Sequence, residues 1–170
     1  MADKNIVIDH LKFSYEGLFN ATELHALIAE FFYSRGWDWH QKMNEELITP
    51  EGKQIKIVFE PWKNISDYYK IKTKIKLNLT DLKDVEIEHE KETLKLNQGL
   101  IRMTFDAYVF NDRKNVWAKK PFYWFLTVIF DKYFFKSNYD KSEHWVKHDI
   151  DELLYKIKSF LNTYKYMYQT

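Results

Sequence analysis

Apolar and charged residues alternate with a period of two through most of the first 110 residues of the chain. Between positions 70 and 77 lysine fills each even position, while Ile71, Ile75 and Leu77 lie at odd ones. Similar alternation surrounds Ile57 and Met103. A period of two is typical of strands with one buried and one solvated face, which are most common in antiparallel sheets. The pattern therefore predicts an antiparallel sheet whose odd-numbered apolar side chains face the core.

Turn residues divide this sheet into about six to seven predicted strands. The clearest breaks are at 50–53, where Pro and Gly occur together, and at 97–99. In chain order, the predicted strands cover 5–15, 37–48 and 54–60, then the neighbourhoods of 72–77, 85–90 and 94–96, and finally 100–110.

Charge complementarity predicts the register of one hairpin in this sheet. Placing Lys74 opposite Glu88 also pairs the neighbouring lysines with glutamates, and it brings Ile75 opposite Ile87. Because both faces agree, we expect a short loop near 80–82. The glutamates would then neutralise the lysines at 70–76. The alternative is that these lysines bind phosphates while a base stacks on Tyr68. Cross-strand pairing with the glutamates is favoured over this alternative.

Two amphipathic helices accompany the predicted sheet. Asn20 followed by Glu23 has the spacing of a capping box at the start of a helix. Gly36 is well placed to end the same helix. The second helix covers about 142–164. Its apolar face consists of Val146, Ile150, Leu153, Leu154, Ile157, Phe160 and Leu161.

A third helical segment is predicted at 122–135, which is rich in aromatic residues. Its apolar run is too short to span a bilayer, which takes about 20 residues. A helix packed on one sheet face buries only part of its circumference, and the terminal helix needs the same surface. We therefore expect an uncovered apolar patch that joins two copies in a homodimer. Burial of this helix within the monomer, or insertion into a membrane surface, is the alternative.

Composition bounds the class of protein. The chain has 170 residues and 0 cysteines, which fits one domain over 1–170 without disulfides or thiolate metal sites. The N-terminus lacks a basic segment followed by an apolar one, so we expect a cytoplasmic protein. With 26 basic and 25 acidic residues, the net charge of +1 argues against a surface that binds polyanions throughout.

The order of strand, helix, several strands and terminal helix predicts an α+β fold in which helices cover the apolar face of a curved antiparallel sheet. This order resembles the START and polyketide-cyclase-like superfamily, which has the helix-grip fold. The resemblance is one of topology over most of the chain. It departs from the family in having one helix after the first strand instead of two, and in the extra segment at 122–135.

The resemblance implies a non-catalytic protein that holds a small apolar ligand between the sheet and the terminal helix. We expect this pocket to be lined by Trp39, Phe59, Tyr69, Phe105 and Phe125. The same large side chains could instead fill the space as a core.

A basic loop at 111–120 favours a different function, as an RNA-binding or ribosome-associated factor. Arg113, Lys114, Lys119 and Lys120 surround Trp117 with one acidic residue to offset them. Four cations and one aromatic ring suit phosphate contact with base stacking, or an anionic membrane surface. The alternative is a solvated loop whose tryptophan packs on the core.

Catalytic and cofactor motifs are missing from the sequence, which favours a non-catalytic protein without a cofactor. The apolar side of the predicted sheet has almost no titratable residue for acid–base chemistry. His144 and His148 have the spacing of a metal-binding pair, but they lie nearly opposite the apolar face of their helix. We expect them to point to water and to bind no metal. A homodimeric protein-interaction module remains a further alternative.

Overall fold

The computed structural model describes residues 4–66, 68–111 and 136–167. The elements in chain order are β1 (Lys4–Phe19), α1 (Ala21–Ser34), β2 (Gln41–Thr49), β3 (Gly52–Phe59), β4 (Trp62–Asn64), β5 (Lys70–His89), β6 (Glu92–Phe110) and α3 (Lys136–Met167). This confirms the predicted α+β class.

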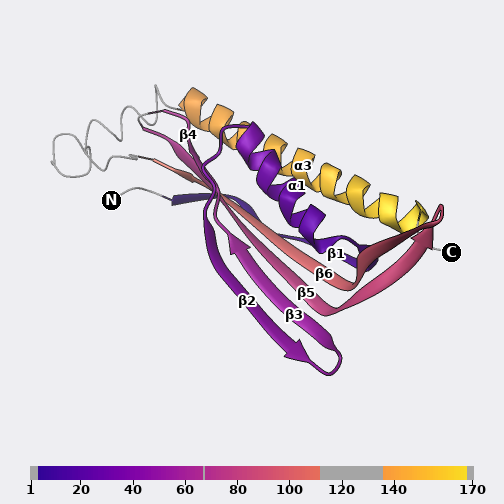
Figure 1. Ribbon diagram of the computed structural model, residues 1–170. Coiled ribbons are helices and arrows are strands. Elements are labelled where there is room, and N and C mark those ends of the chain that lie inside the picture. Colours follow the sequence, from indigo (N-terminus) through magenta and orange to yellow (C-terminus); the bar gives the residue numbers. More distant parts are fainter. Residues whose placement is uncertain (1–3, 67, 112–135, 168–170) are drawn as a thin grey trace.

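The strands form one antiparallel sheet of six strands in the order β1-β6-β5-β3-β2, and the short β4 pairs with β5. Figure 1 shows α1 and α3 on one face of the curved sheet, with the β2–β3 hairpin extending away from them. The core lies between the two helices and this face. It is built largely from the odd-numbered side chains of β5 and β6, as the alternation predicts.

The helix after the first strand forms as its capping signal predicts. The side chain of Asn20 accepts a hydrogen bond from the backbone N–H of Glu23 at 3.2 Å, and α1 ends before Gly36, whose φ is +74°. Instead of closing a capping box, the Glu23 carboxylate accepts a hydrogen bond from the Tyr164 hydroxyl at 2.6 Å. This bond ties the start of α1 to the end of α3.

The terminal helix is longer than predicted, because it begins at Lys136 rather than near 142. The predicted apolar face is largely confirmed. Its members Val146, Ile150, Leu153, Ile157 and Leu161 are buried, whereas Leu154 and Phe160 are partly buried against the core.

The predicted hairpin with its turn at 80–82 is wrong. β5 runs continuously from Lys70 to His89, and Lys74 pairs with Asp106 of β6 instead of Glu88. The chain bends at 80–83 through a shift in register, with Asp81 at a φ of 54° and Leu82 buried. A bulge of this kind kinks a strand without reversing it.

The predicted break at 97–99 is also wrong, since β6 continues through it. A Cβ on Gly99 would lie 2.9 Å from the Thr80 carbonyl oxygen, so glycine here lets the β5 bulge pack against β6. Asn97 connects three elements. Its side chain accepts a hydrogen bond from the Ala21 N–H at 3.0 Å and donates one to Asp84 at 2.8 Å.

Some predictions fall outside the described residues. These are the ligand contact at Phe125, the basic-loop contacts at Arg113, Lys114, Trp117, Lys119 and Lys120, and the dimer segment 122–135. Among the described helices, none is long and apolar enough to cross a membrane.

Candidate functional site

The face of the sheet opposite α1 and α3, called here the outer face, carries the even-numbered side chains of β5. The register places Lys72 between Trp62 of β4 and Tyr108 of β6, and it places Lys70 beside Phe110. Directly paired residues of antiparallel strands project to the same side, so these five side chains share the outer face. We call this set the aromatic–lysine row.

Cations lie directly over the rings of this row. The Lys70 Nζ is 4.3 Å from the centre of the Trp62 ring, and the Lys4 Nζ is 3.9 Å from the centre of the Tyr108 ring. The Tyr108 and Phe110 ring centres are 6.3 Å apart. All three rings are partly exposed. The row therefore offers aromatic surface and positive charge to solvent at the same place.

A basic groove continues from the row along β3 and β5. One hollow of about 400 Å³ is lined by Lys42, Met43, Lys56, Val58, Lys74 and Lys76. A second hollow of about 580 Å³ shares Lys56 with it and is lined by Arg102 and also by Glu45 and Glu46. The two hollows define what we call the basic groove.

The lysines of the groove are not paired with Glu86 and Glu88, as the sequence suggested. Glu86 pairs across the sheet with Lys95, and Glu88 pairs with Thr93, far along β5 from the groove. Within the described residues, Lys56, Lys74 and Lys76 form no ion pair with a carboxylate. Glu45 stands opposite Lys56 and Asp106 opposite Lys74 in the register, so part of this charge is offset at a distance while the ammonium groups themselves stay open to an anionic partner.

Glu60 is the buried acid at the edge of this region, and it is held by two lysines. Its carboxylate lies 2.9 Å from the Lys72 Nζ and 3.2 Å from the Lys42 Nζ. Burial alone would raise the pKa of Glu60. The hydrogen bonds and charges of Lys72 and Lys42 outweigh it and hold the pKa below its usual value.

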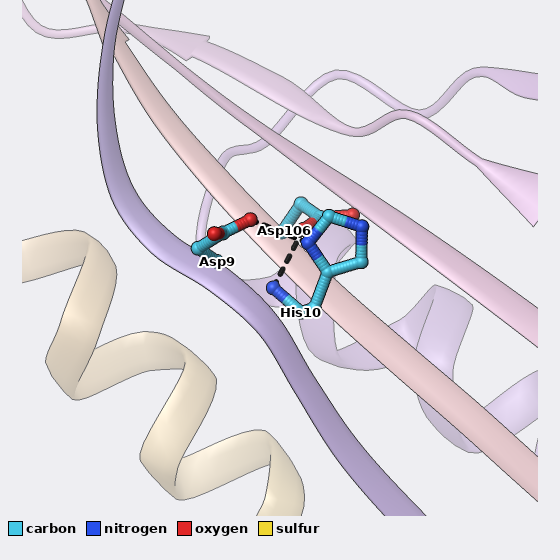
Figure 2. Close-up of side chains that lie close together, drawn as sticks. All are labelled: Asp9, His10 and Asp106. Atoms are coloured by element: carbon cyan, nitrogen blue, oxygen red, sulfur yellow. Dashed lines mark hydrogen bonds and ion pairs between the residues drawn. The ribbon is translucent and has the colours of Figure 1, made fainter.

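A second acidic group lies where β1 bulges against β6. Ile8 pairs with Ala107 and Leu11 with Phe105, so Asp9 and His10 together stand opposite Asp106. Figure 2 shows the three side chains converging, and we call them the carboxylate–histidine cluster. Asp9 and His10 are exposed, whereas Asp106 is only 3% exposed.

The contacts in this cluster centre on His10. Its backbone N–H donates to the Asp106 Oδ1 at 2.8 Å. Its Nδ1 lies 3.4 Å from the same oxygen and also contacts the Asp9 carboxylate. Burial, and then the negative charges of Asp106, Asp9 and Glu60, raise the pKa of the neighbouring Tyr108. The Tyr108 hydroxyl therefore stays protonated at neutral pH.

The predicted pocket residues within the described part of the chain meet in the core. Phe59, Tyr69 and Phe105 are almost completely buried. Trp39 is partly buried, with its ring centre 4.7 Å from that of Phe59. The expectation of an apolar ligand at these residues stays a prediction.

Several residues of the outer face were not predicted from the sequence. Tyr68, suggested as the stacking platform, is only 8% exposed, and Trp62, Tyr108 and Phe110 provide exposed rings instead. A signal existed for two of these rings, because Tyr108 and Phe110 lie at even positions of a strand whose core side chains are odd. His144 and His148 are exposed, as expected, and their rings are stacked on each other.

Comparisons with known proteins give no relative: no family model, curated protein or solved structure matches the chain. Its function is therefore argued from geometry and chemistry. The resemblance to the helix-grip superfamily stays a prediction from topology.

Proposed function

We propose that this protein binds single-stranded nucleic acid on the outer face of its sheet. The observation that carries this proposal is the aromatic–lysine row, in which Lys72 is the cross-strand neighbour of both Trp62 and Tyr108. Proteins that bind single strands combine rings on which bases stack with cations that follow the phosphates. The row provides both on adjacent strands.

The basic groove extends this surface. Lys56, Lys74 and Lys76 form no ion pair with a carboxylate among the described residues, and Arg102 lines the adjoining hollow together with Glu45 and Glu46. Each phosphate that such a side chain neutralises releases counterions, which favours binding at low salt. Although the net charge is only +1, four lysines line the smaller hollow of this groove.

A single strand fits this surface better than a duplex. Stacking on Trp62, Tyr108 or Phe110 needs bases whose faces are free, and a duplex hides them. Direct reading of duplex DNA uses an element that enters a groove. The outer face instead presents side chains above a sheet with shallow hollows.

This proposal keeps nucleic acid as the partner that the basic loop suggested, but it moves the contact to the sheet. The loop residues 111–120 remain a prediction, as does binding of an apolar ligand. The sheet surface is supported by the contact of Lys70 with the Trp62 ring and of Lys4 with the Tyr108 ring.

The lysines are tested by fluorescence anisotropy with a labelled single-stranded RNA of about 16 nucleotides, the upper range for one such domain. We expect the Lys74→Gln/Lys76→Gln protein to bind more weakly. The slope of log affinity against log salt should be smaller by about 1.4, for two lost phosphate contacts on a single strand. The matched control is Lys156→Gln/Lys158→Gln, which makes the same charge change on α3 and should bind normally.

The rings are tested with Tyr108→Leu, which keeps an apolar side chain but removes the stacking surface. A lost stacking contact corresponds to about 1–3 kcal/mol, or roughly 5- to 150-fold weaker binding. Tyr155→Leu is the control, because Tyr155 is 73% exposed on α3. The proposal fails if the wild-type protein shows no salt-dependent binding, or if the outer-face variants bind as well as their controls.

A further inference from the structure

The carboxylate of Asp106 carries a buried negative charge without a lysine or arginine partner among the described residues. Its side chain is 4% exposed, and its contacts are the backbone N–H of His10 and the imidazole of the same residue. Glu60, whose side chain is 9% exposed, is instead held by two lysines. Buried charges in proteins are either paired or coordinate metals. Lys74 stands opposite Asp106 in the register of β5 and β6 but forms no ion pair with it among the described residues, so the Asp106 carboxylate can still accept a positive group.

The β1 bulge brings two further ligand types to this carboxylate. Successive side chains of a regular strand point to opposite faces, so Asp9 and His10 would ordinarily diverge. At the bulge His10 has a φ of 52°, and one ligand atom from each of Asp9, His10 and Asp106 lies within 4.8 Å of the others. Bulges commonly re-aim side chains in this way next to functional sites.

The spacing of these atoms suits a small divalent ion. Two ligands bound to zinc at about 2.1 Å in tetrahedral geometry lie about 3.4 Å from each other. The His10 Nδ1 and the Asp106 Oδ1 are 3.4 Å apart. The Asp9 carboxylate lies closer to the ring than this, and its side chain is 69% exposed.

We propose that Asp9, His10 and Asp106 form a binding site for a divalent transition-metal ion of the zinc class. One imidazole with two carboxylates suits zinc, cobalt or manganese, whereas magnesium and calcium prefer oxygen ligands throughout. The exposure of Asp9 and His10 leaves the remaining coordination positions open to water or to a ligand. Because these residues lie beside Tyr108, a bound cation would also offset the acidic charge next to the aromatic–lysine row.

A proton on His10 is the competing way to balance this site, since an imidazolium would pair with both carboxylates. The two alternatives differ in what the protein binds. A metal site takes up one ion per chain and releases protons as it does so. A salt-bridged histidine takes up none.

Isothermal titration calorimetry of the full chain with zinc at pH near 7, and optical spectroscopy with cobalt, test the proposal. We expect one zinc per chain. Binding should weaken roughly 10-fold or more in Asp9→Asn and in His10→Asn. Asparagine suits the latter position because it tolerates a positive φ. Both residues are exposed, and circular dichroism checks that the variants fold.

The matched control is His148→Gln, which removes the exposed pair with His144 on α3 and leaves the cluster unchanged. It should bind zinc as the wild type does. The proposal is overturned if the wild type binds no stoichiometric zinc, or if Asp9→Asn and His10→Asn bind it unchanged. Neither outcome depends on nucleic acid, so this test is independent of the proposed function.

Discussion

Removal of the Asp149 carboxylate should destabilise the protein by separating α3 from the end of α1. One carboxylate oxygen accepts from the Trp37 Nε1–H at 3.0 Å, and the other lies 2.8 Å from the Arg35 Nη1. Trp37 is 2% exposed, so its indole N–H would lose its partner within the core in Asp149→Ala. An unsatisfied buried donor costs about 1–3 kcal/mol, and the partly exposed ion pair adds up to about 1 kcal/mol. We therefore expect a loss of about 1–4 kcal/mol in the free energy of unfolding.

Urea denaturation followed by tryptophan fluorescence measures this loss. Asp151→Ala is the control, because Asp151 is exposed on the same helix and has no ion pair among the described residues. It should change stability by less than about 0.5 kcal/mol. In Trp37→Phe the donor is already absent, so Asp149→Ala should cost about 1–3 kcal/mol less in that background. The reasoning is refuted if Asp149→Ala behaves like its control, or if its cost is the same with and without the indole.

Three further predictions test other parts of the structure. The pKa of Glu60 in the folded protein lies below the usual value of 4.5. The ionised Glu60 therefore stabilises the fold at pH values above 4.5, and this stabilisation is lost as the pH falls through the pKa of the folded protein. Glu60→Gln should therefore lose less stability on acidification than the wild type does, as measured by urea denaturation at a series of pH values. Gly99→Ala should cost about 1–3 kcal/mol in the same assay at neutral pH, because its Cβ would press on the Thr80 carbonyl oxygen; an unchanged midpoint would contradict the described bulge. Lys95→Glu should cost about 0.2–1 kcal/mol by facing Glu86 across the sheet, and adding Glu86→Lys should restore it; absence of any coupling between the two would contradict the register.

The fold class could be predicted from the sequence because burial imposes a period on each element. The apolar face of α3 follows the helical spacing of Val146, Ile150 and Leu153, and the Asn20 cap depends on neighbouring residues alone. Such local signals survive folding because the side chains concerned meet neighbours a few positions away.

The strand pairing could not be predicted, because alternation does not distinguish a hairpin from one kinked strand. The register of Lys74 with Glu88 satisfied both charge and apolar matching. The structure instead keeps β5 continuous, since the bulge beside Gly99 absorbs the turn-like residues at 80–83. Pairing depends on contacts distant in sequence, which local patterns do not determine.

The outer-face site could not be predicted, because the lysines at 70–76 were assigned the wrong cross-strand neighbours. With glutamates opposite the lysines, the stripe at 70–76 appeared neutral and structural. In the structure Tyr108 and Thr104 stand opposite Lys72 and Lys76, so the same stripe has adjacent rings, while Glu60 holds Lys72 and Asp106 stands opposite Lys74. The carboxylate–histidine cluster could not be predicted either, because it forms only where Asp106 of β6 packs against the bulge at Asp9 and His10 of β1, which is distant in sequence.

Photo-crosslinking tests the central claim, that the outer face binds single-stranded nucleic acid. A single-stranded RNA containing 4-thiouridine is irradiated with the full chain, and the attached peptides are identified by mass spectrometry. We predict crosslinks at Trp62, Tyr108 or Phe110, which decrease as salt is raised. Crosslinks confined to residues 113–120 or to α3, or a complete lack of them at low salt, would contradict the claim.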